Sequence, residues 1–138
     1  MRARVSIYSR AELESLLQEG IFSDTAVICF YDINKGPMDL PLHTDSYQVA
    51  IDGPVFNEMD VLAHFIFYAK ATGLKMICVC ETGLSESAGC AAAIRQYYNG
   101  DGIEVFANIH YFPDKQIYQD VFNALIVESS NLGKCIAG

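Results

Sequence analysis

Residues 75–94, KMICVCETGLSESAGCAAAI, are the stretch of this chain that decides its fold class. Residues 75–80 form a continuous apolar run of strand length, which is typical of a strand covered on both faces. A loop that contains glycine follows at residues 81–84, and an alanine-rich helix is predicted from about residue 85 to residue 98. A buried strand, a tight loop and a helix in this order predict one unit of an α/β sheet.

The segments on either side of this stretch repeat the alternation. Further strands are predicted at 5–8, 26–31 and 47–51. Helices are predicted after the capping box at 9–12, over 58–72 with Asn57 as cap, and from Pro113 onward, whereas the tail after Asn131 has no clear pattern. We therefore predict an α/β fold, with a central, mostly parallel sheet flanked by helices, as a single domain over residues 1–138.

Cys80 stands where the buried strand meets the loop, and a helix begins soon after it. Ligands of such sheets bind beyond the carboxyl ends of the strands, where the N–H groups of a helix N-terminus converge. Aligned N–H groups also stabilise a cysteine thiolate, the form that attacks a phosphate ester. The plain alternative is that Cys80 is a small buried hydrophobic residue, as many free cysteines are.

Residues 77–94 resemble the signature of the cysteine-dependent protein tyrosine and dual-specificity phosphatases, which runs His-Cys-x-x-Gly-x-x-Arg-Ser/Thr. The resemblance covers about residues 26–125 and implies a dual-specificity-phosphatase-like fold. It makes Cys80 the nucleophile, Gly83 the loop glycine and Ser87 the hydroxyl that assists the leaving thiolate. The phosphate-binding loop then consists of Glu81, Thr82, Gly83, Leu84, Ser85 and Glu86.

The same resemblance assigns Asp52 as the general acid that protonates the leaving oxygen. Asp52 ends a predicted strand and lies 28 residues before Cys80, close to the spacing in small members of the family. The alternative is a turn aspartate in Asp52-Gly53-Pro54, because aspartate is common in turns.

Two residues depart from the signature. Glu86 stands in place of the arginine, and Val79 stands in place of the usual histidine. In the family the arginine holds two phosphate oxygens with its planar guanidinium, so a carboxylate at this position both removes the clamp and repels the substrate. Glu86 could also be a plain first-turn helix residue directed away from the loop. In either case phosphatase activity is expected to be very weak or absent.

Composition and charge limit the remaining function classes. The chain has 9 Lys and Arg against 17 Asp and Glu, a net charge of −8, which disfavours nucleic acids and anionic membranes as partners. Five cysteines, an odd count and mostly in apolar runs, indicate a reducing compartment, and residues 1–6 lack the apolar run of a secretory signal, so a cytoplasmic protein is expected. The scattered histidines and cysteines do not have metal-ligand spacing, and no metal or cofactor is expected.

Three functions are consistent with this sequence. The leading hypothesis is a pseudophosphatase-like protein that binds a protein partner or a small anionic ligand at the loop. The second is a residual or altered hydrolase with Cys80 as nucleophile, Asp52 as acid and Ser87 as assistant. The third is a thiol redox or rhodanese-like sulfur-transfer protein that uses Cys80 with Cys78 or Cys90.

Overall fold

A four-stranded parallel sheet forms the centre of the protein in a computed structural model. The structure describes residues 2–20, 24–51 and 58–137, with only the backbone given for 132–137. The strands are β1 (Val5–Ser9), β2 (Thr25–Asp32), β3 (Asp45–Ile51) and β4 (Lys75–Cys80). Their order in the sheet is β1-β4-β2-β3, and every described pairing is parallel. The prediction of a mostly parallel α/β sheet is confirmed.

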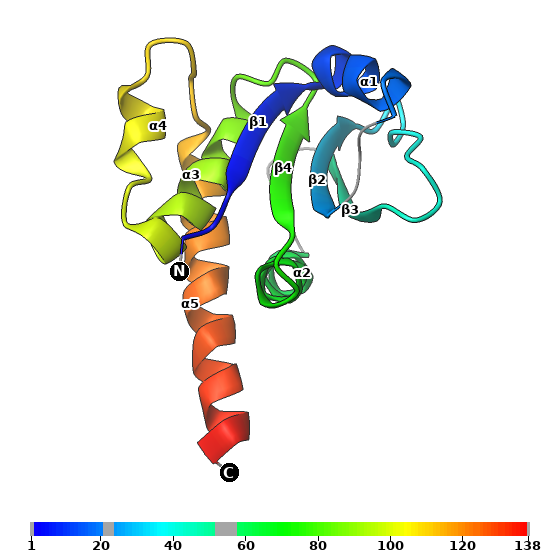
Figure 1. Ribbon diagram of the computed structural model, residues 1–138. Helices are drawn as coiled ribbons and strands as arrows, with labels where there is room; N and C mark the ends of the chain where they lie inside the picture. The colour runs from blue at the N-terminus through cyan, green and yellow to red at the C-terminus, as the bar shows by residue number, and fades with distance from the viewer. Residues whose placement is uncertain (1, 21–23, 52–57, 138) are drawn as a thin grey trace.

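Helices pack on both faces of this sheet (Figure 1). They are α1 (Arg10–Gln18), α2 (Met59–Ala71), α3 (Glu86–Asn99), α4 (Ile103–Ala107) and α5 (Lys115–Ala137). The larger core lies between the sheet and helices α2, α3 and α5. The smaller core on the other face is covered by Leu13 of α1 and by Met38 of the segment that joins β2 to β3.

The central strands β2 and β4 are buried because they have neighbours on both edges and cores on both faces. All residues of β4 after Lys75 are buried, and alternate residues enter opposite cores. Cys78 and Cys80 face the larger core, and Ile77 and Val79 face the smaller one. This two-sided burial explains the unbroken apolar run in the sequence.

Local signals at the helix ends account for several predicted boundaries. The side chains of Ser9 and Glu12 form the reciprocal capping box at the start of α1, and α3 ends at Gly100, which adopts the left-handed conformation with φ +74°. Asn57 lies outside the described residues, and Glu58 precedes α2 without a side-chain cap.

Two features of the helices differ from the prediction. Helix α4 was not predicted; it has only five residues and follows the break at residues 99–102. The tail after Asn131 was not predicted as helix, yet α5 continues to Ala137, because each added residue of an existing helix gains a backbone hydrogen bond. No helix within the described ranges is long and apolar enough to cross a membrane.

Cys29 provides a test of the smaller core. Burial, the largest cause, raises the pKa of the Cys29 thiol from 9.0 to about 11. The unfolded chain loses the Cys29 proton near pH 9, whereas the folded chain keeps it until about pH 11. The contribution of this thiol to stability is therefore complete below pH 9 and is lost as the pH rises through 11. We expect the free energy of unfolding to fall by about 1–2 kcal/mol between pH 8 and pH 10.5 from this group alone.

Urea unfolding of the unmodified protein and of Cys29→Ala at the two pH values isolates this contribution. Val27→Ala is the matched control, since Val27 is buried in the same core and does not titrate. The alkaline fall should be smaller in Cys29→Ala and unchanged in Val27→Ala. Equal falls in all three proteins would contradict the burial of the thiol.

Candidate active site

The loop between β4 and α3 is fixed against the end of β1 by a glycine. Gly83 has φ +71°, a conformation that side chains other than hydrogen rarely adopt. A Cβ at Gly83 would lie 2.5 Å from the backbone nitrogen of Ser9 and 2.8 Å from the carbonyl carbon of Tyr8. The loop can therefore pass this close to β1 only because residue 83 has no side chain.

Polar groups of the loop and of α3 surround the sulfur of Cys80. The backbone N–H of Gly83 donates to Cys80 Sγ at 3.2 Å, and the hydroxyl of Ser87 lies 3.1 Å from the same atom. Thr82 Oγ1 is 4.0 Å away, and both Cys80 and Ser87 are buried. Donors on two sides of a sulfur can stabilise negative charge on it, which is what a thiolate nucleophile requires.

The segment before α5 holds the outer side of this loop. Phe112 N–H donates to the carbonyl of Leu84 at 2.8 Å, and Asp114 N–H donates to the carbonyl of Ser85 at 3.1 Å. Asp114 also caps α5 by accepting from Ile117 N–H at 3.0 Å. The close approach depends on Gly89, where a Cβ would meet the carbonyl oxygen of Asp114 at 2.5 Å. The loop is thus held by contacts with two chain segments, the end of β1 and the residues before α5.

An acidic cavity of about 330 Å³ opens beside the loop, at the carboxyl ends of the sheet's strands. Three carboxylates line it, those of Asp32 at the end of β2, Glu81 in the loop and Glu86 at the start of α3. The remaining lining residues are Phe30, Ile33, Asn34 and Ile51. Glu86 therefore borders a cavity beside the loop, and Cys80 and Ser87 are not among the described residues that line it.

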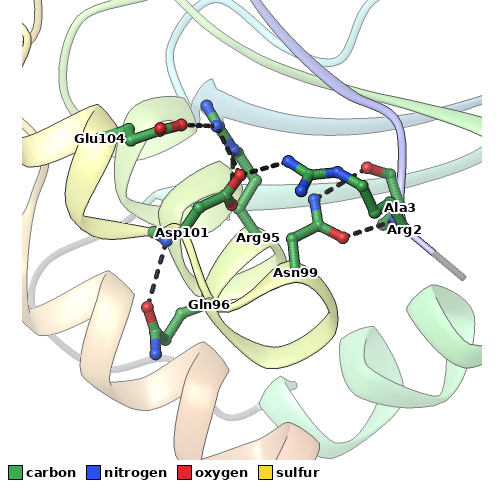
Figure 2. A network of polar contacts seen from close by, with 8 residues as sticks. Arg2, Ala3, Arg95, Gln96, Asn99, Asp101 and Glu104 are labelled. Atoms are coloured by element: carbon green, nitrogen blue, oxygen red, sulfur yellow. Dashed lines mark hydrogen bonds and ion pairs between the residues drawn. The ribbon is translucent and has the colours of Figure 1, made fainter.

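Three cations, Lys35, Arg10 and Arg95, are engaged with other groups. Lys35 pairs with Glu81 at 3.0 Å, and Arg10 donates to the carbonyls of Gly36 and Pro37. Arg95, the only arginine of α3, is held by Asp101 and Glu104, as Figure 2 shows. Within the described part of the chain, no ion pair neutralises Glu86.

The thiol of Cys78, two residues before Cys80, is held in the protonated form. A side-chain hydrogen bond with Cys90, followed by burial, raises the pKa of Cys78 well above its usual range. Cys78 on β4 and Cys90 on α3 are both fully buried. A protonated, buried thiol is a poor nucleophile, which weakens the case for redox or sulfur-transfer chemistry that uses Cys80 with Cys78.

Two aspartates, Asp52 and Asp32, differ in how the sequence analysis treated them. Asp52, the assigned general acid, lies outside the described residues, and its role remains a prediction. Asp32 was not singled out, although it follows the apolar run of β2, whose carboxyl end adjoins that of β4. That position was the available signal, because the carboxyl ends of parallel strands meet at one edge of a sheet.

The described residues hold no group of three or more His, Cys, Asp or Glu side chains with the arrangement of a metal site. The features that remain at the end of β4 are a buried cysteine with two polar neighbours, a clamped loop and an acidic cavity. The roles of Cys80 as nucleophile and of Ser87 as assistant remain predictions.

Solved structures are similar to this chain in fold, although no family model matches the sequence and no curated protein sequence matches it. The human tyrosine phosphatase-like serine/threonine/tyrosine-interacting protein is similar with a TM-score of 0.58 and 17% identity, over 86% of this chain and 85% of that one. Human DUSP28 is similar with a TM-score of 0.58 and 11% identity, over 92% and 94%. This chain has the dual-specificity phosphatase fold.

The tyrosine phosphatase OH1 from the Orf virus also shares this phosphatase fold, with a TM-score of 0.57 and 12% identity, over 91% of this chain and 82% of that one. Such low identities establish the fold alone and leave the chemistry to the residues of the site. In this chain, the described lining of the cavity beside the loop includes three carboxylates, those of Asp32, Glu81 and Glu86.

Proposed function

We propose that this chain is a phosphatase-fold protein in which phosphoryl transfer is impaired or absent and which works by binding a partner. The observation that carries the proposal is the place of Glu86, in one cavity with Asp32 and Glu81 beside the Cys80 loop. A cavity with this charge is unsuited to a phosphate ester, which carries up to two negative charges.

The size of the effect follows from Coulomb's law. Two unit charges about 4 Å apart repel by roughly 4 kcal/mol at an effective dielectric of about 20, and a dianion doubles that cost. Lys35 offsets one carboxylate by its pair with Glu81, which leaves Asp32 and Glu86. An arginine would instead stabilise the transition state, and loss of one such donor costs on the order of 100-fold to 1000-fold in rate.

The same charges favour a protein partner over the small anionic ligand that the sequence also allowed. A neutral or cationic side chain could enter the cavity without the repulsion that an anion meets. One similar solved structure, of a human protein, carries the name of a phosphatase-like interacting protein, so the name of another chain with this fold already refers to interaction. The partner itself remains a proposal.

An assay with an aryl phosphate tests the proposal. Purified protein is expected to show a kcat/KM at least about 100-fold below that of an arginine-containing dual-specificity phosphatase assayed in parallel, because the clamp is missing. Phosphate release over a pH series from 5 to 8 is the measurement. Turnover within tenfold of the reference enzyme would overturn the proposal.

A second candidate, a residual or altered hydrolase, is favoured by the surroundings of Cys80. The hydroxyl of Ser87 at 3.1 Å and the N–H of Gly83 at 3.2 Å lie where a thiolate needs them. Cys80→Ser separates the two candidates: any slow hydrolysis that belongs to this site should disappear in the variant. Activity that survives Cys80→Ser is not cysteine-based and excludes this candidate.

A further inference from the structure

A basic cavity lies at the end of the sheet opposite the Cys80 loop. Its volume is about 190 Å³, and three of the chain's 9 Lys and Arg residues line it: Arg2, Arg4 and Lys70. The other lining residues are Ala3, Ala71, Gly73 and Leu74. None of the described lining residues is acidic, although the chain has 17 Asp and Glu. We call this the amino-end cavity.

The positions of Arg2 and Arg4 are set by Ala3, the residue between them. Asn99 of α3 clamps the buried Ala3 by accepting from its N–H at 2.7 Å and donating to its carbonyl at 3.0 Å (Figure 2). Met76 N–H donates to the carbonyl of Arg4 at 2.9 Å, which extends the pairing of β1 with β4. In an extended chain alternate side chains share a side, so anchoring Ala3 inward sets Arg2 and Arg4 toward the same cavity.

Existing contacts hold the cations without neutralising all of them. Arg4 donates to the carbonyl of Gly73 at 3.2 Å, which is a neutral partner. Arg2 pairs with Asp101 at 2.6 Å, but Asp101 is also held by Arg95 at 3.0 Å (Figure 2). Glu104 also pairs with Arg95, so these two arginines and two carboxylates balance, and the net positive charge at the cavity comes from Arg4 and Lys70.

Lys70 adds the third charge from the last turn of α2. Its ammonium lies 5.6 Å from the centre of the Tyr98 ring, which is an electrostatic contact that leaves the charge in place. The C-terminal carbonyls of α2 are satisfied locally: those of Tyr68, Ala69 and Lys70 accept from the backbone N–H groups of residues 72–74. Because these carbonyls are already bonded, the negative end of α2 opposes an anion less.

We propose that the amino-end cavity binds a phosphate group, either as free phosphate or as a small phosphomonoester. Two guanidinium groups and an ammonium match the charge and the several oxygens of a phosphate, and arginine pairs with such oxygens in a bidentate manner. The site is separate from the Cys80 loop, since the six residues of β4 hold the two ends of the sheet roughly 20 Å apart. It does not depend on the proposed function.

Amide NMR of isotope-labelled protein during a titration with inorganic phosphate tests this site. Sodium chloride at matched ionic strength is the reference for general screening. We expect saturable shifts at residues 2–4 and 70–74 with phosphate and not with chloride. A parallel titration with glycerol phosphate distinguishes the two sources: stronger binding of the ester identifies a phosphomonoester as the preferred ligand, and equal binding identifies the phosphate group itself.

Arg4→Gln and Lys70→Gln are each expected to weaken phosphate binding at least about tenfold, the equivalent of one lost charge-assisted contact. Lys115→Gln is the matched control, because Lys115 is an exposed cation outside the cavity. Lys70→Gln is the variant less prone to misfold, since the side chain of Lys70 donates to no described backbone group, whereas that of Arg4 donates to the carbonyl of Gly73. Thermal unfolding of each variant verifies the fold.

Two results would overturn the inference: absence of saturable shifts at residues 2–4 and 70–74, or affinity unchanged in both cavity variants. Saturable shifts at residues 80–87 are a separate outcome. They would count against the proposed loss of anion binding at the loop and leave the amino-end cavity to be judged on its own residues.

Discussion

Gly83→Ala is expected to lower the free energy of unfolding by about 2–4 kcal/mol. A positive φ costs about 1 kcal/mol for a residue with a side chain, and overpacking a tight site adds typically 1–3 kcal/mol. At Gly83 both costs apply, because φ is +71° and the new Cβ would meet the backbone of Ser9 at 2.5 Å. The atoms that it meets belong to the strand-to-helix junction at β1 and cannot rotate away.

Gly100→Ala is the matched control for this prediction. Gly100 has a similar φ of +74°, and a Cβ there would meet nothing within 4 Å, so only the conformational cost of about 1 kcal/mol applies. Urea unfolding of the three proteins at pH 7 gives the comparison. If the two variants lose the same stability, the loop is not pressed against β1, and the surroundings of Cys80 derived from that contact are wrong.

The sequence allowed good prediction of β4 and the helix after it because their signals are local. Six apolar residues, a glycine and a run of alanines need no knowledge of distant segments, and β4 spans the predicted residues 75–80. The capping box at Ser9 and Glu12 is local in the same way. A parallel sheet followed from the alternation of strands and helices.

Features that depend on distant contacts could not be read from the sequence. The hydrogen bonds from Phe112 and Asp114 to the loop join residues almost 30 positions apart, and no sequence pattern in 108–114 predicts them. The cavity that Asp32 shares with Glu86 arises only when β2 and β4 are adjacent in the sheet. The amino-end cavity likewise needs Asn99 to fix Ala3, 96 residues away.

The resemblance of residues 77–94 to the phosphatase signature predicts an arginine where this chain has Glu86, and the consequence of that difference depends on where the side chain lies. A first-turn glutamate could face solvent and interact only with the helix dipole. The structure places Glu86 on the wall of the acidic cavity, without an ion pair among the described residues. A carboxylate in this cavity beside the Cys80 loop makes position 86 the place to test the effect of charge on anion binding.

Glu86→Arg is expected to raise the affinity of the Cys80 loop for inorganic phosphate by on the order of 100-fold or more. The change removes a repulsion of roughly 4 kcal/mol per unit charge at about 4 Å and supplies a bidentate donor in its place. The measurement is the saturation of amide NMR shifts at residues 80–87, which separates this loop from the amino-end cavity. Aryl phosphate hydrolysis should rise with binding, provided that Cys80 and Ser87 keep their 3.1 Å contact.

Two further variants divide the effect into its parts. Glu86→Gln removes the repulsion without adding a donor, so its gain should fall between those of the unmodified protein and Glu86→Arg. Glu14→Arg makes the same change in net charge on the exposed face of α1 and should leave binding at residues 80–87 unchanged. If Glu86→Arg gains no more than Glu14→Arg, then charge at position 86 does not limit anion binding, because a loop with the backbone of an active phosphatase would have responded to its arginine.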